Sequence, residues 1–422
     1  MLFSSSVFSM TLLEAIKVSL QNNPKMVANE ARISAMEDRL EAARLSSMPF
    51  VSIGAGQSYN YSAGEASSQG RRVGISTSVS LFDGGAHRHA VAARESDLKA
   101  SIAQYNSTSP MMSNTRASIA AEVLMSYVSI VELNERIRYL TYAETTLKLY
   151  LKVATAEEAV TIQESISELQ NTLLTLKFSL RESEKGFKYY STIPAPPFEQ
   201  LQTIGQAIQS LGIPENAEEA FRIALDKNPD IKLAEYNLNS NREYSEAEKA
   251  RHGLQVTASA SVDRGGSSRR GYGTSASVGI QAQMTFDVSN RHSQRASEKS
   301  VAAAQSDLEG TIDEKKFKIE STYPLLQNQM DLYTSYLANL KTARENLDRV
   351  LAAVEAGESV DMIKVGIPRL NAFRSASSNT LSQQISILRI RFGIQQLVGT
   401  LFENLGIDTS VNSFSKSYNK KY

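Results

Sequence analysis

The chain has 422 residues, and its 45 Lys and Arg side chains balance 45 Asp and Glu side chains. This neutral balance excludes the broad basic surface that a sequence-independent nucleic-acid binder requires. The absence of cysteine excludes disulfides, cysteine-ligated zinc, thiol nucleophiles and an N-terminal lipid-modified cysteine. No run approaches the roughly 18 to 20 consecutive apolar residues of a membrane-spanning helix, so we expect no helical membrane protein.

The first ten residues, Met1 to Met10, are apolar and rich in serine but lack a basic stretch. They fit either the remnant of a removed export signal or an expression start. A motif that follows them returns 205 residues later: Glu14-Ala15, Leu20 and Asn23-Pro24 recur as Glu219-Ala220, Leu225 and Asn228-Pro229. The offset predicts an internal duplication. We expect residues 1–192 to form the first repeat, 193–214 a linker, 215–404 the second repeat and 405–422 a loose tail.

Each repeat changes from a helical period to a period of two after its first helix. In residues 51–82, apolar side chains such as Ile53 and Ile75 alternate with serine and glycine, and residues 255–286 repeat the pattern. A loop rich in Gly, Ser and Arg interrupts each segment, so each predicts a β-hairpin. Strands of about 9 to 11 residues with one apolar and one polar face fit a transmembrane β-barrel. The alternation fits an ordinary antiparallel sheet with one solvated face equally well.

Aromatic residues at the hairpin ends favour the membrane interpretation. Tyr59, Tyr61 and Tyr272 lie near the loops, and Phe82 and Phe286 lie near the helical end, as two interfacial girdles would. Phe82 is out of phase with the apolar residues of its strand. The smallest barrels use about eight strands, so either the chain oligomerises or its sheet is not in a membrane. Three copies with four strands each would supply twelve strands and an aqueous lumen.

A long helical arm follows each hairpin, over residues 86–150 and 289–356. An arm of about 65 residues is roughly 100 Å long. We expect Pro110 to kink or divide the first arm and Pro324 to break the second. Return helices are expected at 157–190 and 368–404, which leaves two tips near residues 153–158 and 357–367.

These features together resemble the TolC family of outer-membrane channel proteins over nearly the whole chain. The resemblance rests on the Asn-Pro motif of each half, on Leu81-Phe82-Asp83-Gly84-Gly85 before the first arm, and on Leu397-Val398-Gly399-Thr400-Leu401 near the end. It implies an α+β membrane protein, a homotrimer whose twelve-stranded transmembrane β-barrel takes four strands from each chain. That barrel would continue into a long periplasmic α-helical coiled-coil barrel.

The resemblance also implies a location and partners. The protein would lie in the outer membrane of a Gram-negative bacterium, contact outer-membrane lipid and extend into the periplasm. It would dock on a periplasmic adaptor (membrane fusion) protein and on an inner-membrane transporter of the ABC or proton-driven type.

Functional positions, by the same resemblance, lie at the two tips, where side chains close an aperture and the adaptor binds. Glu358, Asp361 and Lys364 are candidates for the aperture, because three copies of a carboxylate at a constriction attract cations. The acidic residues also fit helix-cap positions. The candidates for adaptor contact are Val153, Ala154, Thr155, Gly357 and Ser359.

Both tips depart from the family pattern. Ala154-Thr155 stands where many members have a Val-Gly-Leu-like turn. The segment from Lys364 to Pro368 stands where an Asp-containing helix is common. The adaptor contacts are therefore expected to differ from those of drug-efflux relatives.

No catalytic or metal site is expected. His87 and His89, beside Asp83, fit a solvated strand-to-helix junction better than a metal cluster. The sequence has no Gly-x-Ser-x-Gly elbow and no phosphate-binding loop. We therefore expect a protein that is not an enzyme, needs no cofactor and binds no nucleic acid.

The leading hypothesis is a passive exit duct of a tripartite type I secretion or efflux system. The missing N-terminal cysteine argues against the lipid-anchored efflux subset, and the unusual first tip favours type I protein secretion over multidrug efflux. The alternative is a structural coiled-coil stalk or scaffold with soluble β-hairpin caps.

Overall fold

The structure, a computed structural model, describes residues 10–60, 68–108, 115–267, 271–284, 288–358 and 360–407. These residues divide into two compact units. Unit 1 contains residues 10–30, 103–232 and 311–407, and unit 2 contains residues 31–102 and 233–310. Each unit draws on both halves of the sequence, whereas the expected repeats follow one another along the chain.

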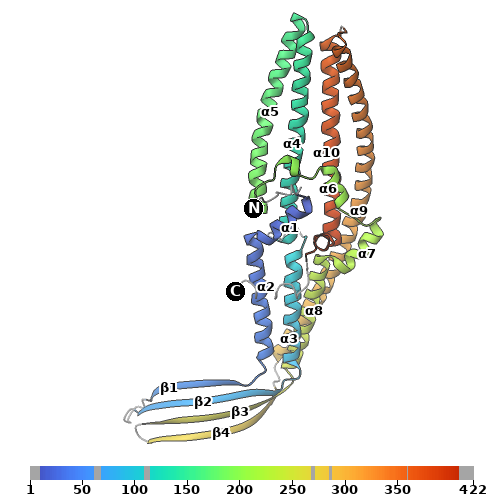
Figure 1. Cartoon of the computed structure of the whole chain (residues 1–422). Helices are drawn as coiled ribbons and strands as arrows, with labels where there is room; N and C mark the ends of the chain where they lie inside the picture. The colour runs from blue at the N-terminus through green and yellow to red at the C-terminus, as the bar shows by residue number, and fades with distance from the viewer. Residues whose placement is uncertain are drawn as a thin grey trace, which may run out of the picture. The chain divides into compact units, whose positions relative to one another are not determined.

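Unit 1 is helical (Figure 1). Its elements are α1 (Leu12–Asn22), α4 (Arg116–Val153), α5 (Ala156–Ser191), the 3-10 turn η1 (Phe198–Gln200), α6 (Ile204–Ser210), α7 (Ala217–Lys227), the π-helical turn η2 (Met362–Gly366), α10 (Ile367–Val398) and α11 (Leu401–Asn404). Unit 2 contains most of α3 (Ala86–Asn106) and the strands β1 (Phe50–Asn60), β2 (Ser68–Phe82), β3 (Leu254–Ser267) and β4 (Gly271–Met284). Besides α3, whose last residues belong to unit 1, three helices contribute residues to both units: α2 (Pro24–Leu45), α8 (Pro229–Arg251) and α9 (Val288–Glu355).

Each Asn-Pro motif joins two helices in the same way. Asn23 lies between α1 and α2, Asn228 lies between α7 and α8, and the proline that follows opens the next helix, where its missing N–H is not needed. The Asn23 amide donates to the Tyr190 carbonyl of α5 over 3.3 Å, and the Asn228 amide donates to the Leu397 carbonyl of α10 over 2.6 Å. The last carbonyls of a helix have no partner within it. Each asparagine therefore ties the start of its half of the chain to the end of the return helix in that half.

Apolar seams between helices form the core of unit 1. One cluster joins α4, α5, α9 and α10 and includes the fully buried Ala143, Tyr150, Ile162 and Leu347. A second cluster joins α7, α9 and α10, and its members are Ala220, Ala224, Ile319, Leu326, Ile387, Ile394 and Val398. Full burial of one Leu or Ile side chain stabilises a fold by about 1.5–3 kcal/mol. These clusters therefore hold the helical pairs together.

An ion pair is buried in unit 1 next to the end of α3. Asp230 of α8 contacts Lys315 of α9, and the two side chains are 9% and 5% exposed. The carboxylate also accepts hydrogen bonds from the hydroxyl groups of Ser107 and Thr108. Burial raises the pKa of Asp230, but Lys315 and the two hydroxyl groups lower it by more, so the pKa lies below its ordinary value. The ionised carboxylate thus fixes the chain where it leaves α3.

Helix α9 is continuous from Val288 to Glu355 although Pro324 lies inside it. The expectation that Pro324 breaks this arm is wrong. Ile319 and Leu326 are buried on either side of the proline, and the Tyr323 hydroxyl donates to the Pro214 carbonyl over 2.9 Å. A proline removes one backbone hydrogen bond from a helix. Packing of its neighbours holds α9 together across the missing bond.

The first arm is divided, as expected: α3 ends at Asn106 and α4 begins at Arg116. Pro110 itself lies outside the described residues. The linker 193–214 contains η1 and α6. The buried Tyr127 of α4 anchors it, since the hydroxyl accepts from the Gln202 N–H over 2.8 Å and donates to the Met10 carbonyl over 3.0 Å.

The strands form one antiparallel sheet in the order β1-β2-β3-β4 (Figure 1). Its register shifts between Ser80 and Phe82, at a β-bulge in β2. The bulge places Phe82 opposite Val256, on the same face as the apolar residues. This extra residue is why Phe82 is out of phase in the sequence.

The junction from β2 to α3 explains the Asp-Gly-Gly sequence. The Asp83 carboxylate accepts from the N–H groups of Gly85 and His87 over 2.9 and 2.7 Å, and so caps α3. Gly84 and Gly85 have φ of +66° and +90°, which favour glycine. A Cβ on Gly84 would lie 3.1 Å from the Ala250 carbonyl oxygen of α8. The motif therefore permits a sharp turn against α8.

Candidate functional site

The two faces of the sheet differ in chemistry. Residues paired across antiparallel strands lie on the same face, so the register sorts every strand into two sets. One set is small and polar and is called the polar face: Ser52, Gly54, Gly56 and Ser58 of β1, Arg72, Gly74, Ser76 and Ser78 of β2, Ser259, Ser261, Asp263 and Gly265 of β3, and Gly273, Ser275, Ser277 and Gln281 of β4. These side chains suit contact with water.

A row of serines crosses the polar face from one edge of the sheet to the other. Ser52 pairs with Ser76, Ser76 with Ser261, and Ser261 with Ser277. The hydroxyl oxygens of the first pair lie 2.7 Å apart, and those of the last pair lie 2.9 Å apart. The row gives this level of the sheet a continuous hydroxyl surface.

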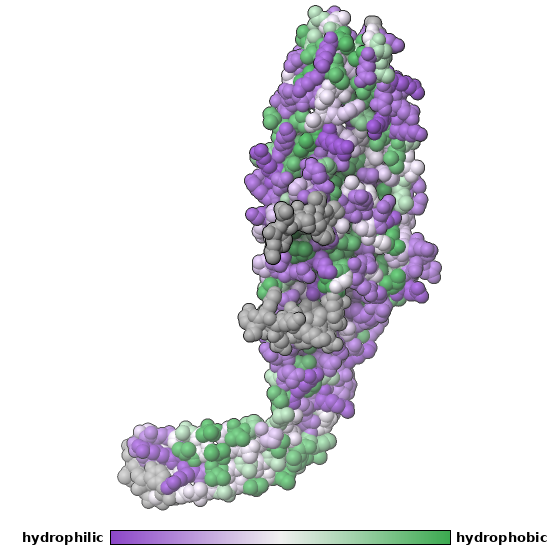
Figure 2. Space-filling view, viewed as in Figure 1, coloured by the Kyte–Doolittle hydropathy of each residue, from purple (hydrophilic) through white to green (hydrophobic). Residues whose placement is uncertain are grey.

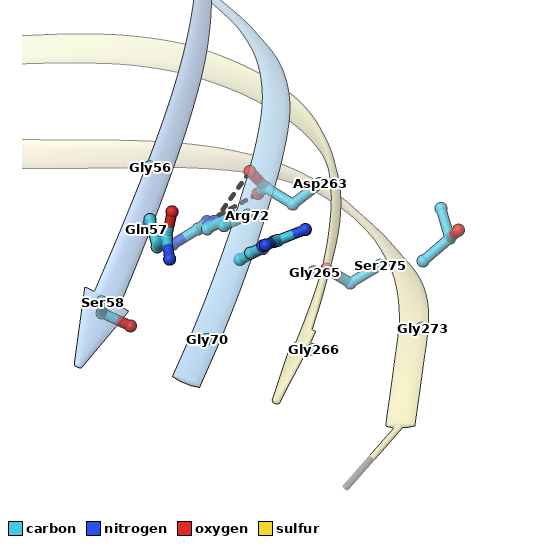
Figure 3. Close-up of a pocket in the computed structure, with 12 residues that line it drawn as sticks. Gly56, Gln57, Ser58, Gly70, Arg72, Asp263, Gly265, Gly266, Gly273 and Ser275 are labelled. Carbon is cyan, nitrogen blue, oxygen red and sulfur yellow. Dashed lines mark hydrogen bonds and ion pairs between the residues drawn. The ribbon is translucent and has the colours of Figure 1, made fainter. Parts of the chain in front are cut away.

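An ion pair joins the two hairpins on the polar face (Figure 3). The Arg72 guanidinium contacts the Asp263 carboxylate twice, with Nε 3.0 Å from Oδ1 and Nη2 2.7 Å from Oδ2. Gly74 leaves the space for this carboxylate, because a Cβ there would lie 2.0 Å from Oδ1. The pair binds β2 to β3 near their loop ends, where it lines a shallow pocket with Gly56, Ser58 and Ser275.

The opposite set is hydrophobic and is called the apolar face: Val51, Ile53 and Ala55 of β1, Val73, Ile75 and Val79 of β2, Val256, Ala258, Ala260 and Val262 of β3, and Ala276, Val278, Ile280 and Ala282 of β4. Val278, Ile53 and Ile280 are 87%, 77% and 73% exposed. Hydrophobic residues gather along the visible side of the strands in Figure 2. An apolar surface of this extent marks an interface with lipid or protein. Alternation with a polar face is the pattern of a transmembrane β-sheet.

One described helix, α4, contains a window long and apolar enough to cross a membrane by composition. Half of that window is buried. Helix α4 packs on α1, α5 and α10 within unit 1. Its apolar side chains are thus used in the helical core.

The aromatic candidates are only partly described. Tyr59 lies on β1 among the apolar-face positions, and its hydroxyl accepts from the Gln57 amide over 2.6 Å. Tyr272 lies on β4 opposite Gly266. Tyr61 and Phe286 lie outside the described residues. The two aromatic girdles remain a prediction.

At the first tip, the turn from α4 to α5 is held by a capping box. Val153 is the last residue of α4, Ala154 caps it, and Thr155 is the N-cap of α5. The Thr155 N–H and hydroxyl both donate to Glu158 Oε2 over 2.9 Å, and the Glu158 N–H donates back to Thr155 Oγ1 over 3.4 Å. The sequence Thr155-x-x-Glu158 is the signal for this motif.

Glu158 also binds the second tip, which the sequence did not indicate. Its Oε1 accepts from the Met362 N–H over 2.9 Å. Hydrogen bonds from the Thr155 backbone, the Thr155 hydroxyl and the Met362 backbone lower the pKa of Glu158 below its ordinary value. One carboxylate therefore joins the two tips of unit 1.

At the second tip, Gly357 ends α9 with φ of +76°. The exposed Glu358 donates its N–H to the Ala353 carbonyl over 2.9 Å. Asp361 is the N-cap of η2: its side chain accepts from the Lys364 N–H over 2.8 Å and lies 3.4 Å from Lys364 Nζ. These contacts, the backbone hydrogen bond first, lower the pKa of Asp361. Ser359 lies outside the described residues.

Close packing fixes η2 against α4. Gly366 is buried, and a Cβ there would lie 3.2 Å from the Tyr150 ring and 3.0 Å from the Met362 sulfur. Tyr150 is fully buried, and burial raises its pKa to about 12. The structure therefore brings Asp361 and Lys364 together and links them to the first tip through Met362.

The histidines near the strand-to-helix junction have separate partners. His89 Nδ1 lies 2.8 Å from a Glu243 oxygen, and His87 Nδ1 lies 3.3 Å from the Ser46 hydroxyl. Among the described residues, no three His, Cys, Asp or Glu side chains are grouped so as to hold a metal ion. These contacts join α3 to its neighbours in unit 2.

A sheet with one apolar and one polar face, in a chain whose helical pairs end in tips that contact each other, fits the class of outer-membrane channel proteins. The family model described as "Outer membrane efflux protein" matches residues 15–170 and 221–362. The chain belongs to this family. It is therefore an efflux channel protein of the Gram-negative outer membrane that extends into the periplasm.

Solved structures share the fold of this chain. The Neisseria gonorrhoeae MtrE outer membrane channel, in its open state, has a TM-score of 0.68 at 14% identity, over 97% of this chain and 95% of that one. A Pseudomonas aeruginosa membrane protein has a TM-score of 0.68 at 16% identity, over 94% and 90%. The Vibrio cholerae outer membrane protein VceC has a TM-score of 0.66 at 13% identity, over 94% and 97%. No curated protein sequence matches the chain.

Proposed function

We propose that the protein is the outer-membrane exit duct of a tripartite export system and that it works as a homotrimer. The observation that carries this proposal is a two-faced sheet with two open edges. Strands β1 and β4 form those edges. In lipid, an open edge leaves backbone N–H and C=O groups without partners, so a spanning sheet must close.

The strand directions suit closure between copies. Strand β1 runs towards its hairpin loop and β4 runs away from its loop, so β4 of one copy would meet β1 of the next in antiparallel orientation. Three copies would form a barrel of twelve strands, with the polar faces around an aqueous lumen and the apolar faces towards lipid.

The helical pairs supply the rest of the duct. Helices α4 and α5, with α9 and α10, would form a periplasmic α-helical barrel whose tips form the aperture. Val153, Ala154, Thr155, Gly357 and Ser359 would contact the adaptor at these tips. The duct performs no chemistry, because an inner-membrane transporter of the ABC or proton-driven type supplies the energy.

The two halves of the chain act as repeats in this proposal. The matching hydrogen bonds of Asn23 and Asn228 support an internal duplication, with residues 1–192 and 215–404 as the repeated parts. Each repeat would supply one hairpin to the barrel and one helical pair to the periplasmic part.

The cargo is either small molecules or exported protein. The family description names efflux, which favours small molecules as the cargo. The Ala154-Thr155 turn supports type I protein secretion, because it departs from the turn of drug-efflux relatives. Deletion of the gene in its host separates the two: increased drug susceptibility indicates efflux, and loss of a secreted protein indicates secretion.

Cysteine cross-linking tests the trimer directly, because the natural chain has no cysteine. Ser52→Cys on β1 would be combined in turn with Gly273→Cys, Ser275→Cys, Ser277→Cys and Gly279→Cys on β4. At least one pair should give a disulfide-linked trimer in detergent, and the unmodified protein should form a gated, low-conductance pore in planar bilayers. Soluble monomers without detergent would contradict the duct and favour the stalk or scaffold.

A further inference from the structure

Charged side chains in the sheet are confined to its loop end. The four strands contain only four of them: Arg71 and Arg72 on β2, and Asp263 and Arg264 on β3. Arg72 and Asp263 neutralise each other on the polar face. The register places Arg71 opposite Gly266 and Arg264 opposite Val73, so both belong to the apolar face.

On the apolar face, each of these two arginines directly follows the hydrophobic run of its strand. On β2 the run of alternate positions passes through Ile75 and Val73 and then reaches Arg71; on β3 it passes through Ala260 and Val262 and then reaches Arg264. Both arginines are exposed. The described strands hold no carboxylate on this face, so neither arginine has a counter-ion on the apolar face.

The position of the arginines matches the outer surface of a membrane. Arg264 is ten residues from Leu254, or about 33 Å along the strand, and a strand tilted by about 40° then rises about 25 Å, which is the height of the apolar band in outer-membrane barrels. Strands meet helices at Phe50, Phe82 and Leu254. In the proposed duct those helices would extend into the periplasm. The loop end therefore faces the exterior. Hydrophilic residues return at this end of the sheet in Figure 2.

We propose that Arg71 and Arg264 form a binding site for the phosphate groups of an anionic glycolipid in the outer leaflet, of the diphosphorylated lipid A class. This inference rests on the proposed membrane-spanning duct. A guanidinium binds phosphate through paired N–H donors and keeps its charge at every physiological pH. Gly266, which pairs with Arg71 on the apolar face, has no side chain to cover the backbone, so a headgroup can approach closely.

Native mass analysis of detergent-purified protein tests the site with diphosphoryl lipid A as the probe. The variant R71Q/R264Q should bind it about 30-fold more weakly, because each arginine near an anionic lipid surface contributes about fivefold. R71K/R264K keeps both charges and should keep most of the binding. The matched control R72Q/D263N removes the charged pair of the polar face and should bind lipid A as the natural protein does.

Two further binding measurements distinguish lipid phosphate from free inorganic phosphate as the group that the arginines bind. Lipid A without phosphate groups should bind about 30-fold more weakly to the natural protein, by the same charge argument. Inorganic phosphate at millimolar concentration should not displace diphosphoryl lipid A, and complete displacement would overturn the lipid assignment. Equal binding of lipid A by the natural protein and R71Q/R264Q would also overturn it.

Conductance of the same preparations in uncharged bilayers tests the proposed duct independently of lipid A binding. If the natural protein conducts but lipid A binding does not depend on the arginines, only the glycolipid site fails. If it does not conduct, the proposed duct fails, and the glycolipid site fails with it.

Discussion

At the residue scale, the Glu158 carboxylate accepts hydrogen bonds from the turns of both helical pairs. One oxygen accepts from Thr155 and the other accepts from Met362. The first contact follows from a four-residue motif and is readable in the sequence. The second joins residues 204 positions apart, and no local pattern predicts it.

We expect Glu158→Gln to loosen the second tip. A neutral amide offers one oxygen, so the contacts to Thr155 and Met362 cannot both persist. Hydrogen exchange of the backbone amides in 360–366 should become several-fold faster at neutral pH. Glu157→Gln, an exposed neighbour, is the matched control and should leave the exchange unchanged; equal exchange in both variants would show that Glu158 does not hold the tip.

The same contact should depend on pH. Because the pKa of Glu158 is lowered in the folded chain, its stabilisation is complete above the ordinary value of 4.5 and is lost as the pH falls through the lower, folded value. Exchange in 360–366 of the natural protein should therefore approach that of Glu158→Gln only in acid. A difference between the two that persists at pH 2 would contradict this reading.

The buried ion pair gives a second test at this scale. Lys315→Met leaves Asp230 buried without its cation and should destabilise unit 1 by about 3–5 kcal/mol. Asp230→Leu combined with Lys315→Met should recover most of that loss, because a hydrophobic pair of similar volume needs no counter-ion. Thermal unfolding followed by helical circular dichroism measures both. A double variant as unstable as Lys315→Met would contradict the account.

At the element scale, much of the secondary structure was predictable. The period of two, with serine and glycine on one side, identified both hairpins, because each strand has one polar and one apolar face. The bulge at Phe82 and the continuity of α9 through Pro324 were not predictable. Both depend on packing from distant parts of the chain, which outweighs local preference.

The ends of the two return helices provide a matched pair for mutation. Gly399 ends α10 with φ of +84°, and Thr192 ends α5 with φ of +63°. A Cβ on Gly399 would also lie 2.3 Å from the Lys227 carbonyl oxygen. Gly399→Ala should therefore destabilise unit 1 by about 2 kcal/mol or more, whereas Thr192→Gly should stabilise it by up to about 1 kcal/mol. Equal effects on thermal unfolding would contradict the difference between the two caps.

At the scale of the whole molecule, the two compact units do not coincide with the two sequence repeats. Each unit takes its helices from both halves of the chain. The sequence offset predicts a duplication but contains no information on which helices pack together. The Arg72–Asp263 ion pair joins residues from different halves, and the Asp230 carboxylate of the second half accepts hydrogen bonds from Ser107 and Thr108 of the first; neither contact was predicted.

Conductance tests the aperture proposed at the second tip. Asp361→Asn with Glu358→Gln should raise single-channel conductance or reduce the preference for cations, since three copies lose six carboxylates at a constriction. Asparagine is a good N-cap, so the η2 turn should persist. The control is Asp348→Asn, an exposed carboxylate on α9. If the currents of the double variant equal those of the natural protein, Glu358 and Asp361 do not line the aperture.

The Arg72–Asp263 pair has a consequence for permeation. Because the two charged side chains on the polar face of the described strands neutralise each other, a barrel lined by these strands would impose almost no electric field on a passing solute. The hydroxyl groups and glycines of this face would bind solutes only weakly, so the barrel would select solutes by their size. Discrimination by charge would then fall to the periplasmic entrance, so a cargo would be selected before it reaches the membrane and not while crossing it.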